Sequence, residues 1–152
     1  MKTVLTYGTF DLFHVGHVRL LKRLRSLGDR LIVGCSSDQF NNSKGKNSIF
    51  SYDERSEILQ SCQFVDVVFP EHNWNQKADD IKLYQASIFA MGDDWAGKFD
   101  YLSDLTEVYY LPRTDGISTT DIKSVLASSQ EQKLLQIKNA LGTLSDLIQN
   151  YT

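Results

Sequence analysis

The segment Y-G-T-F-D-L-F-H-V-G-H at residues 7–17 joins an apolar strand directly to an amphipathic helix. It places His14 and His17 at a strand-to-helix turn, which is where an α/β sheet binds its ligands. Because these histidines are three residues apart, they lie on one face of one helical turn. A helix N-terminus favours phosphate through its free N–H groups and its dipole, and imidazoles there can donate further hydrogen bonds. Two surface or helix-capping histidines are the simpler alternative, but T-F-D-x-x-H-x-G-H straight after a strand favours a phosphate site.

Strands and helices alternate along the chain, and the pattern of apolar residues indicates their positions. Strands are predicted at residues 3–7, 30–34, 65–69, 86–91 and 107–111. Helices are predicted at 15–27, 52–62, 75–84 and 118–126, with a short helix within 98–105 and a polar loop at 41–48. This order predicts an α/β fold, a Rossmann-like parallel five-stranded sheet with helices on both faces. Such strands end at one common edge, so the polar segments that follow them should converge there.

Composition excludes several classes of protein. The length of 152 residues suits one domain with its own core, expected at 1–126. The net charge of −3 argues against a broad nucleic-acid surface but allows a local basic cluster for a small anion. Cys35 and Cys62 have no zinc or C-x-x-C spacing and are expected to be reduced thiols. No apolar run approaches the roughly 20 residues of a membrane span, and residues 1–5 enter a strand at once, so we expect a cytoplasmic protein without a signal peptide.

Two basic segments are candidates for phosphate binding. Lys44 and Lys46 flank Gly45 in the polar loop, so both ammonium groups could swing onto a phosphate-bearing ligand. Taken alone, a solvated loop is the more common explanation of such lysines. Lys77 lies near a helix start, where the helix dipole disfavours lysine, and this placement is a weak indication of a ligand.

Polar residues also follow the last two predicted strands. Asp93 and Asp94 form a carboxylate pair that can bind Mg²⁺ or accept a hydrogen bond from a ribose or substrate hydroxyl, although a simple turn is equally compatible. Arg113 follows the fifth strand, and three hydroxyl residues at 118–120 open the next helix. An arginine fork together with hydroxyl and backbone N–H groups predicts a second phosphate-binding element.

Taken together, these segments resemble the cytidylyltransferases of the nucleotidyltransferase superfamily that carries a His-x-Gly-His motif. The resemblance runs from residue 1 to about 126. Its motifs are the 7–17 segment, K-G-K, S-Y-D-E-R, P-E-H-N-W, M-G-D-D-W-A-G-K-F-D and Y-L-P-R-T-D-G-I-S-T-T. The histidine motif is shared with adenylyltransferases, whereas R-T-x-G-I-S-T-T is more specific for the cytidylyltransferase branch. The segment M-G-D-D-W-x-G-K-F-D is similar to its glycerol-phosphate group.

The resemblance implies a reaction and a set of residue roles. The acceptor phosphate of sn-glycerol 3-phosphate would attack the α-phosphorus of CTP, giving CDP-glycerol and pyrophosphate for a teichoic-acid-like or capsular polymer. Mg²⁺ would accompany the nucleotide through its phosphates, and the enzyme would be a homodimer. The implied catalytic residues are His14, His17, Lys44 and Arg113. The implied nucleotide-binding residues are Thr9, Phe10, Gly16, Asp94, Thr114, Gly116, Ile117, Ser118, Thr119 and Thr120. The implied acceptor-binding residues are Asp11, Lys46, Arg55 and Lys77.

Several alternatives stay open at this point. The acceptor could be another small phosphorylated alcohol such as phosphoethanolamine, the nucleotide could be ATP, or the chain could be a catalytically poor binding subunit. Gln63 stands where relatives often carry arginine, which keeps the last alternative alive.

The C-terminal extension, expected at 127–152, is helical and differs in composition from the rest of the chain. Its apolar residues repeat at alternating spacings of three and four over about two and a half heptads. They are Leu134, Ile137, Leu141, Leu144, Ile148 and Tyr151. A helix packed on its own domain and a helix that binds a second chain are both compatible with this pattern.

Overall fold

The computed structural model describes residues 1–113 and 118–151. The chain divides into two compact units, Met1–Gly116 and Ile117–Thr152. The first unit contains the sheet, and the second consists of one long helix. No helix in the described part of the chain is long and apolar enough to cross a membrane.

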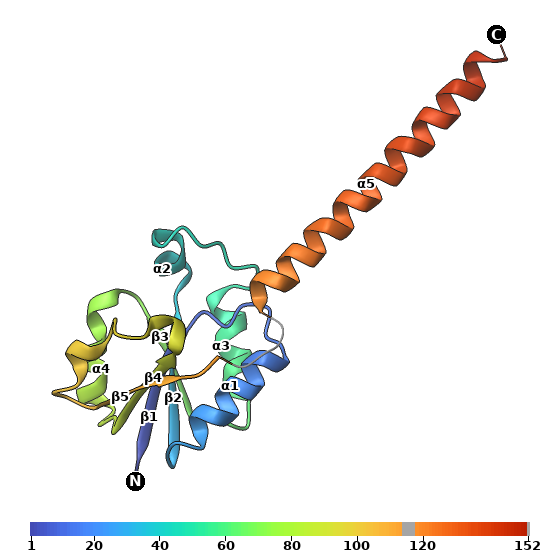
Figure 1. Ribbon diagram of the computed structural model, residues 1–152. Coiled ribbons are helices and arrows are strands. Elements are labelled where there is room, and N and C mark those ends of the chain that lie inside the picture. Colours follow the sequence, from blue (N-terminus) through green and yellow to red (C-terminus); the bar gives the residue numbers. More distant parts are fainter. Residues whose placement is uncertain (114–117, 152) are drawn as a thin grey trace. The chain divides into compact units, whose positions relative to one another are not determined.

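Five parallel strands form the centre of the first unit (Figure 1). They are β1 (Thr3–Gly8), β2 (Arg30–Ser36), β3 (Val67–Glu71), β4 (Ile88–Gly92) and β5 (Glu107–Leu111). Their order is β3-β2-β1-β4-β5, so β1 pairs with β2 on one side and with β4 on the other. The chain first proceeds from β1 toward β3 and then crosses to β4 and β5. The order of strands therefore reverses next to β1, and an open α/β sheet binds ligands at that switch point.

Helices cover both faces of this sheet, as the sequence predicts. They are α1 (Val15–Arg25), α2 (Asp38–Ser43), α3 (Tyr52–Ser61), α4 (Lys77–Leu83) and the short 3-10 helices η1 (Trp74–Gln76), η2 (Asp93–Trp95) and η3 (Asp100–Leu102). Figure 1 shows α1 and α3 on one side of the sheet and α4 on the other.

Each face of the sheet has its own core. Val4 packs with Leu21 and Leu24 of α1 on one face. Its neighbour Leu5 packs with Ile81 of α4 and Phe89 on the other. Consecutive residues of a strand point to opposite faces, so a sheet covered on both sides has strands that are apolar throughout.

Three predicted elements differ from those observed. Part of the predicted polar loop is α2, whose N-cap Ser37 accepts a hydrogen bond from the backbone N–H of Phe40. Strand β3 continues through Pro70, where we expected it to stop. Because β3 lies at the edge of the sheet, proline can occupy it without losing an internal ladder bond. The predicted helix at 75–84 is divided into η1 and α4.

The second unit is the helix α5 (Thr119–Gln149). A capping box closes its N-terminus, because Ser118 accepts from the N–H of Asp121 while the Asp121 carboxylate accepts from the N–H of Ser118. The helix passes residue 127 without interruption, and none of its residues is buried. A boundary at 126/127 therefore has no counterpart in secondary structure and stays a prediction.

Replacing Gly34 by alanine tests how tightly the second core is packed. A Cβ at this position would lie 2.4 Å from Cδ1 of Tyr7 and 3.0 Å from Cζ of Phe69. The Tyr7 ring cannot withdraw easily, because its hydroxyl donates to Asp80 Oδ2 at 2.7 Å. We expect Gly34→Ala to lower the free energy of unfolding by about 1–3 kcal/mol, measured by urea denaturation followed by tryptophan fluorescence.

The matched control is Gly142→Ala in α5. A Cβ there meets nothing within 4 Å, so alanine relieves only the helix-destabilising effect of glycine. We expect no loss of stability in this variant. Equal midpoints for Gly34→Ala and the unmodified chain would contradict the packing argument.

Candidate active site

The carboxyl ends of the parallel strands bring the segments that carry the candidate residues to one edge of the sheet. The turn with His14 and His17 follows β1, and Lys44 directly follows α2, which comes after β2. Lys77 comes after β3, and Asp94 after β4. Arg113 comes two residues after the end of β5. The first of these segments leaves β1 at the switch point of the sheet.

The turn after β1 has a strained and closely packed backbone. Phe10 and Leu12 have φ angles of 54° and 50°, in the left-handed region that non-glycine residues rarely adopt. The Phe10 ring folds back over Gly8, where a Cβ would lie only 2.7 Å from the ring. Glycine is therefore required at the end of the strand. Such strain persists only where surrounding contacts hold it in place, and it is typical of functional sites.

Asp11 supplies part of that support. Its buried carboxylate accepts hydrogen bonds from the backbone N–H groups of Ile49 at 2.7 Å, Phe50 at 3.0 Å and Leu12 at 3.1 Å. It thereby joins the turn after β1 to the segment before α3. The resemblance implied that Asp11 binds the acceptor, but its oxygens are directed to the backbone. These contacts brace the turn, and acceptor binding by Asp11 stays a prediction.

The two histidines cap α1 reciprocally. His14 is the N-cap residue, and its Nδ1 accepts from the N–H of Gly16 at 3.0 Å. His17 Nδ1 accepts from the N–H of His14 at 3.2 Å. A neutral imidazole that accepts at Nδ1 carries its proton on Nε2. Each ring therefore has an Nε2–H donor, and the ring centroids are 3.9 Å apart. Helix capping and phosphate binding are thus compatible roles for this pair, because they use different nitrogens.

Burial keeps both rings neutral. Desolvation lowers the pKa of His14, and it lowers the pKa of His17 to about 4, with a smaller contribution from the neighbouring His14 and an opposing one from Asp11. The His17 ring stacks on Phe13 and meets Phe10 edge to face. At neutral pH this pair consists of two hydrogen-bond donors without net charge.

Arg55 is completely buried and is bonded to the ends of two strands. Its Nη1 donates to the carbonyl oxygens of Thr9 at 2.9 Å and Ser36 at 2.8 Å. Its Nε donates to the carbonyl of Phe50 at 3.0 Å, and its Nη2 pairs with Asp38 Oδ1 at 2.9 Å. The resemblance implied a contact between Arg55 and the substrate. A guanidinium with no exposed surface, four oxygen acceptors and Cys35 Sγ at 3.3 Å positions the loops that surround the site, and its contact with substrate stays a prediction.

Lys77 and Lys44 are linked through a shared carboxylate. Lys77 Nζ is buried and lies 2.7 Å from Glu71 Oε2. Glu71 Oε1 accepts from the Ser36 hydroxyl at 3.0 Å, and that hydroxyl oxygen accepts from Lys44 Nζ at 3.3 Å. Burial lowers the pKa of Lys44, while the Glu71 charge opposes that change. Two ammonium groups against one carboxylate leave a cluster with a formal positive charge, which suits an anionic ligand.

Aromatic rings surround these two ammonium groups. Lys44 Nζ lies 4.1 Å from the ring centroid of Phe40, and both lysines lie within 5.4 Å of the Trp74 centroid. Trp74 also packs near Trp95, with centroids 5.8 Å apart, and is 45% exposed. Ring faces attract cations and exclude water from one side of them. This half-open aromatic wall could therefore cover the carbon skeleton of a small phosphorylated ligand.

The remaining predicted residues are less closely connected. Asp94 is exposed, and its carboxylate folds back over Gly92. Arg113 is exposed, and its backbone N–H donates to Asp93 Oδ2 at 3.3 Å. Lys46 is also exposed. Thr9 donates its hydroxyl proton to Asn41 Oδ1 at 3.1 Å.

The predicted residues of the R-T-x-G-I-S-T-T segment divide between two groups. Ser118, Thr119 and Thr120 lie at the start of the second unit. Thr114, Gly116 and Ile117 lie outside the described residues.

A magnesium ion is chemically compatible with this edge of the sheet. The described residues contain no group of three or more His, Cys, Asp or Glu side chains arranged around one point. Mg²⁺ in nucleotide enzymes commonly takes one or two carboxylates and completes its shell with substrate phosphates and water. Asp93 and Asp94 are carboxylates that could serve in this way.

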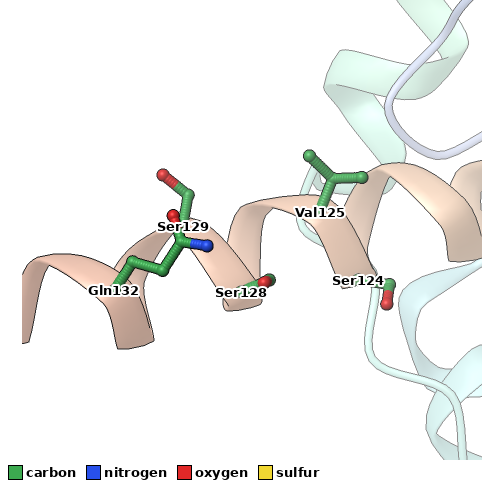
Figure 2. Close-up of a pocket in the computed structure, with 5 residues that line it drawn as sticks. All are labelled: Ser124, Val125, Ser128, Ser129 and Gln132. Carbon is green, nitrogen blue, oxygen red and sulfur yellow. The ribbon is translucent and has the colours of Figure 1, made fainter. Parts of the chain in front are cut away.

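A hollow on α5 is a separate feature. Figure 2 shows its lining, which comes from Ser124, Val125, Ser128, Ser129 and Gln132. It contains no cationic side chain and none of the predicted site residues. We therefore do not assign it to phosphate binding.

Sequence reasoning missed Glu71, Ser36 and Asp38 as parts of this site. Glu71 and Ser36 lie at the ends of neighbouring strands, and their residue types are common in turns. A buried carboxylate needs a partner, so the acidic residue at the end of an apolar strand was the available signal for Glu71. Glu71 and Ser36 are 35 residues apart in the sequence, so no local pattern indicates their hydrogen bond.

The fold and the site define a class of α/β protein whose first strand ends in a turn suited to phosphate. A family model described as cytidylyltransferase-like matches residues 5–125, and the chain belongs to that family. It is 57% identical over 128 residues to a glycerol-3-phosphate cytidylyltransferase of Bacillus spizizenii, a match that covers 84% of this chain and 99% of the relative. It is 52% identical over 126 residues to the Staphylococcus aureus protein of the same name, covering 83% and 96%.

A solved structure supports the fold alone. The lipopolysaccharide core biosynthesis protein of Thermoplasma volcanium aligns with a TM-score of 0.65 at 24% identity, covering 76% of this chain and 99% of that one.

The His17 environment predicts a pH-dependent stability. The ordinary pKa near 6.5 applies to the unfolded chain, and the folded value is about 4. Between pH 6.5 and 4 the unfolded chain binds a proton at this side chain that the folded chain does not bind. The free energy of unfolding should therefore fall as pH drops from 6.5 toward 4. In His17→Asn the side-chain oxygen can still accept from the His14 N–H but does not titrate. Urea denaturation at pH 7.5 and 5.0 should show a smaller loss of the free energy of unfolding in this variant than in the unmodified chain. Equal losses in the two proteins would contradict the burial argument.

Replacing Arg55 by lysine tests its positioning role. Lysine keeps the charge but cannot reach four acceptors in three directions, which leaves buried carbonyl groups without donors. We expect Arg55→Lys to lower the free energy of unfolding by about 2–4 kcal/mol in urea denaturation. Arg19, which is exposed on α1, is the matched control, and Arg19→Lys should change stability by less than about 0.5 kcal/mol. An Arg55→Lys protein as stable as the control would refute this role.

Proposed function

We propose that this chain transfers the cytidylyl group of CTP to sn-glycerol 3-phosphate, producing CDP-glycerol and pyrophosphate. The observation that carries the proposal is the histidine pair at the N-terminus of α1. Both rings accept backbone hydrogen bonds at Nδ1, which leaves Nε2–H as the donor of each at a helix terminus suited to phosphate. Membership of the cytidylyltransferase-like family, and the names of the relatives that match almost over their whole length, favour this nucleotide and this acceptor.

The chemistry needs no covalent enzyme intermediate. An oxygen of the acceptor phosphate attacks the α-phosphorus of CTP in line, and the bond from that phosphorus to the bridging oxygen of the β-phosphate breaks. Negative charge shifts onto the leaving pyrophosphate. Enzymes accelerate such a transfer mainly by positioning the groups and stabilising this charge. His14 and His17 would donate from Nε2 to the phosphate oxygens, and Arg113 with Ser118, Thr119 and Thr120 would hold the triphosphate.

The lysine cluster would receive the acceptor. Lys77 and Lys44 supply positive charge on either side of the Glu71–Ser36 pair, and Trp74 covers them. A phosphate that enters between these lysines would replace part of their contact with Glu71 and Ser36. Lys46 is exposed nearby in sequence and would add a further cation from the loop after α2. Such a site recognises the phosphate firmly, so phosphoethanolamine is the acceptor that must be tested against glycerol 3-phosphate.

Mg²⁺ would be held mainly by the CTP phosphates, with Asp93 and Asp94 as available carboxylates, and would supply neutralisation of phosphate charge. The enzyme would be a cytoplasmic homodimer. Its product would feed a teichoic-acid-like or capsular polymer.

Pyrophosphate release tests the reaction directly. The purified chain is incubated with Mg²⁺ and each combination of CTP or ATP with glycerol 3-phosphate, phosphoethanolamine or no acceptor. We expect release only from CTP with glycerol 3-phosphate. Release with phosphoethanolamine alone would keep the chemistry and change the acceptor, whereas release with ATP in place of CTP would overturn the nucleotide assignment. The absence of release from every pair would favour a binding subunit, an alternative that the exposed Gln63 keeps open.

Removing either histidine should slow turnover. His14→Ala and His17→Ala each delete an Nε2–H donor, and the loss of one such donor typically lowers kcat by about 10²–10³. The third histidine of the chain, His72, is exposed on the segment after β3, and His72→Ala should turn over normally. The turnover of all three variants is measured by steady-state pyrophosphate release. Turnover of His14→Ala and His17→Ala within a few fold of the control would show that neither ring stabilises the reacting phosphates.

A further inference from the structure

Apolar residues of α5, together with Tyr151 just beyond its end at Gln149, form a continuous and exposed stripe. The six residues at its heptad a and d positions are each between 55% and 93% exposed. Leu134, Leu141 and Ile148 occupy the a positions, and Ile137, Leu144 and Tyr151 occupy the d positions. The alternation of three and four residues is the repeat that lets one helix pack along another. From these residues we propose that two copies of this chain associate through α5, with the two helices antiparallel.

The stripe is complementary to itself when the helices are antiparallel. Aligning Leu134 of one copy with Tyr151 of the second copy also aligns Ile137 with Ile148 and Leu141 with Leu144. Every layer then pairs an a residue with a d residue, and all six apolar residues of each helix are covered. The paired segment is 18 residues long, and its helical part, residues 134–149 of α5, spans about 24 Å.

Flanking residues decide between the two orientations. In a parallel pair, the g position of one helix faces the next e position of the other. Lys133 and Lys138 occupy these positions, so a parallel pair would place two lysines against each other on both sides of the interface. Like charges at such positions are destabilising. In the antiparallel alignment the e positions face one another, and Lys138 lies opposite Ser145.

The antiparallel alignment also buries more apolar surface. The g positions then face one another, which brings Leu147 of one copy to Ala140 of the other. Leu147 is 55% exposed in the single chain, and it lies outside the six-residue stripe. The orientation that avoids the lysine contact is therefore also the one that covers Leu147.

This surface belongs to the extension that lies beyond the family match and beyond the relatives that match over almost their whole length. The family model ends at residue 125, and the Bacillus spizizenii relative aligns over 99% of its own length while leaving 16% of this chain unmatched. The association through α5 is thus independent of the proposed reaction and of any contact made by the sheet unit.

Cysteine cross-linking tests both the association and its direction. The L134C and Y151C variants are made in the full chain, each with Cys62→Ser to remove the partly exposed native thiol. They carry different affinity tags and are mixed and mildly oxidised. We expect a disulfide between residue 134 of one variant and residue 151 of the other. L134C alone should give none, because its two copies of residue 134 would be about 25 Å apart in the antiparallel pair.

Paired lysine substitutions provide the control. Leu141→Lys with Leu144→Lys, added to both cysteine variants, should abolish the cross-link by placing charges in the central layer. Gln136→Lys with Thr143→Lys adds the same charge outside the stripe and should preserve it. A disulfide in L134C alone would overturn the antiparallel arrangement. The absence of any disulfide in the mixture, or its persistence in the Leu141→Lys/Leu144→Lys background, would overturn association through this stripe.

Discussion

The guanidinium of Arg55 is the interaction on which the arrangement of the candidate active site depends. It donates to the carbonyl oxygens of Thr9, which follows β1, and of Ser36, which ends the adjacent strand β2. Thr9 opens the turn that carries the histidines, and the Ser36 hydroxyl joins Glu71 to Lys44. One buried cation therefore supports both the proposed nucleotide side and the proposed acceptor side. Arginine serves here because its planar fork can satisfy several acceptors at once without leaving a buried polar group unpaired.

A second constraint is the way in which burial adjusts the charged and polar groups. The histidines are desolvated enough to stay neutral, so their Nε2–H groups donate without the cost of holding two positive rings 3.9 Å apart. Net positive charge is concentrated instead in Lys44 and Lys77, where Glu71 compensates only part of it. The site thus separates neutral donors, suited to stabilise developing charge, from cations suited to attract a phosphorylated acceptor.

Most of the fold was predictable, and the exceptions have local causes. The central strands β1, β2 and β4 are almost wholly buried and largely apolar, and the edge strands β3 and β5 contain short apolar runs, which made all five detectable from the sequence. Helix α2 was missed because Asn41, Asn42 and Ser43 are typical turn residues, and its stability depends on the Ser37 cap and on burial of Phe40. The end of β3 was placed too early because proline usually ends a strand, a rule that does not apply at a sheet edge.

The sequence by itself determined the order of the elements and the family, and it predicts a phosphate site at the turn of residues 7–17. These properties depend on short segments whose residue types and spacing act locally. Only the tertiary structure decided that Asp11 and Arg55 brace the loops, and that Glu71 and Ser36 connect the two lysines. Those roles include hydrogen bonds between groups that the chain separates by 19 to 46 residues. Burial decides whether such a group meets water, substrate or protein, and burial is a property of the folded chain alone.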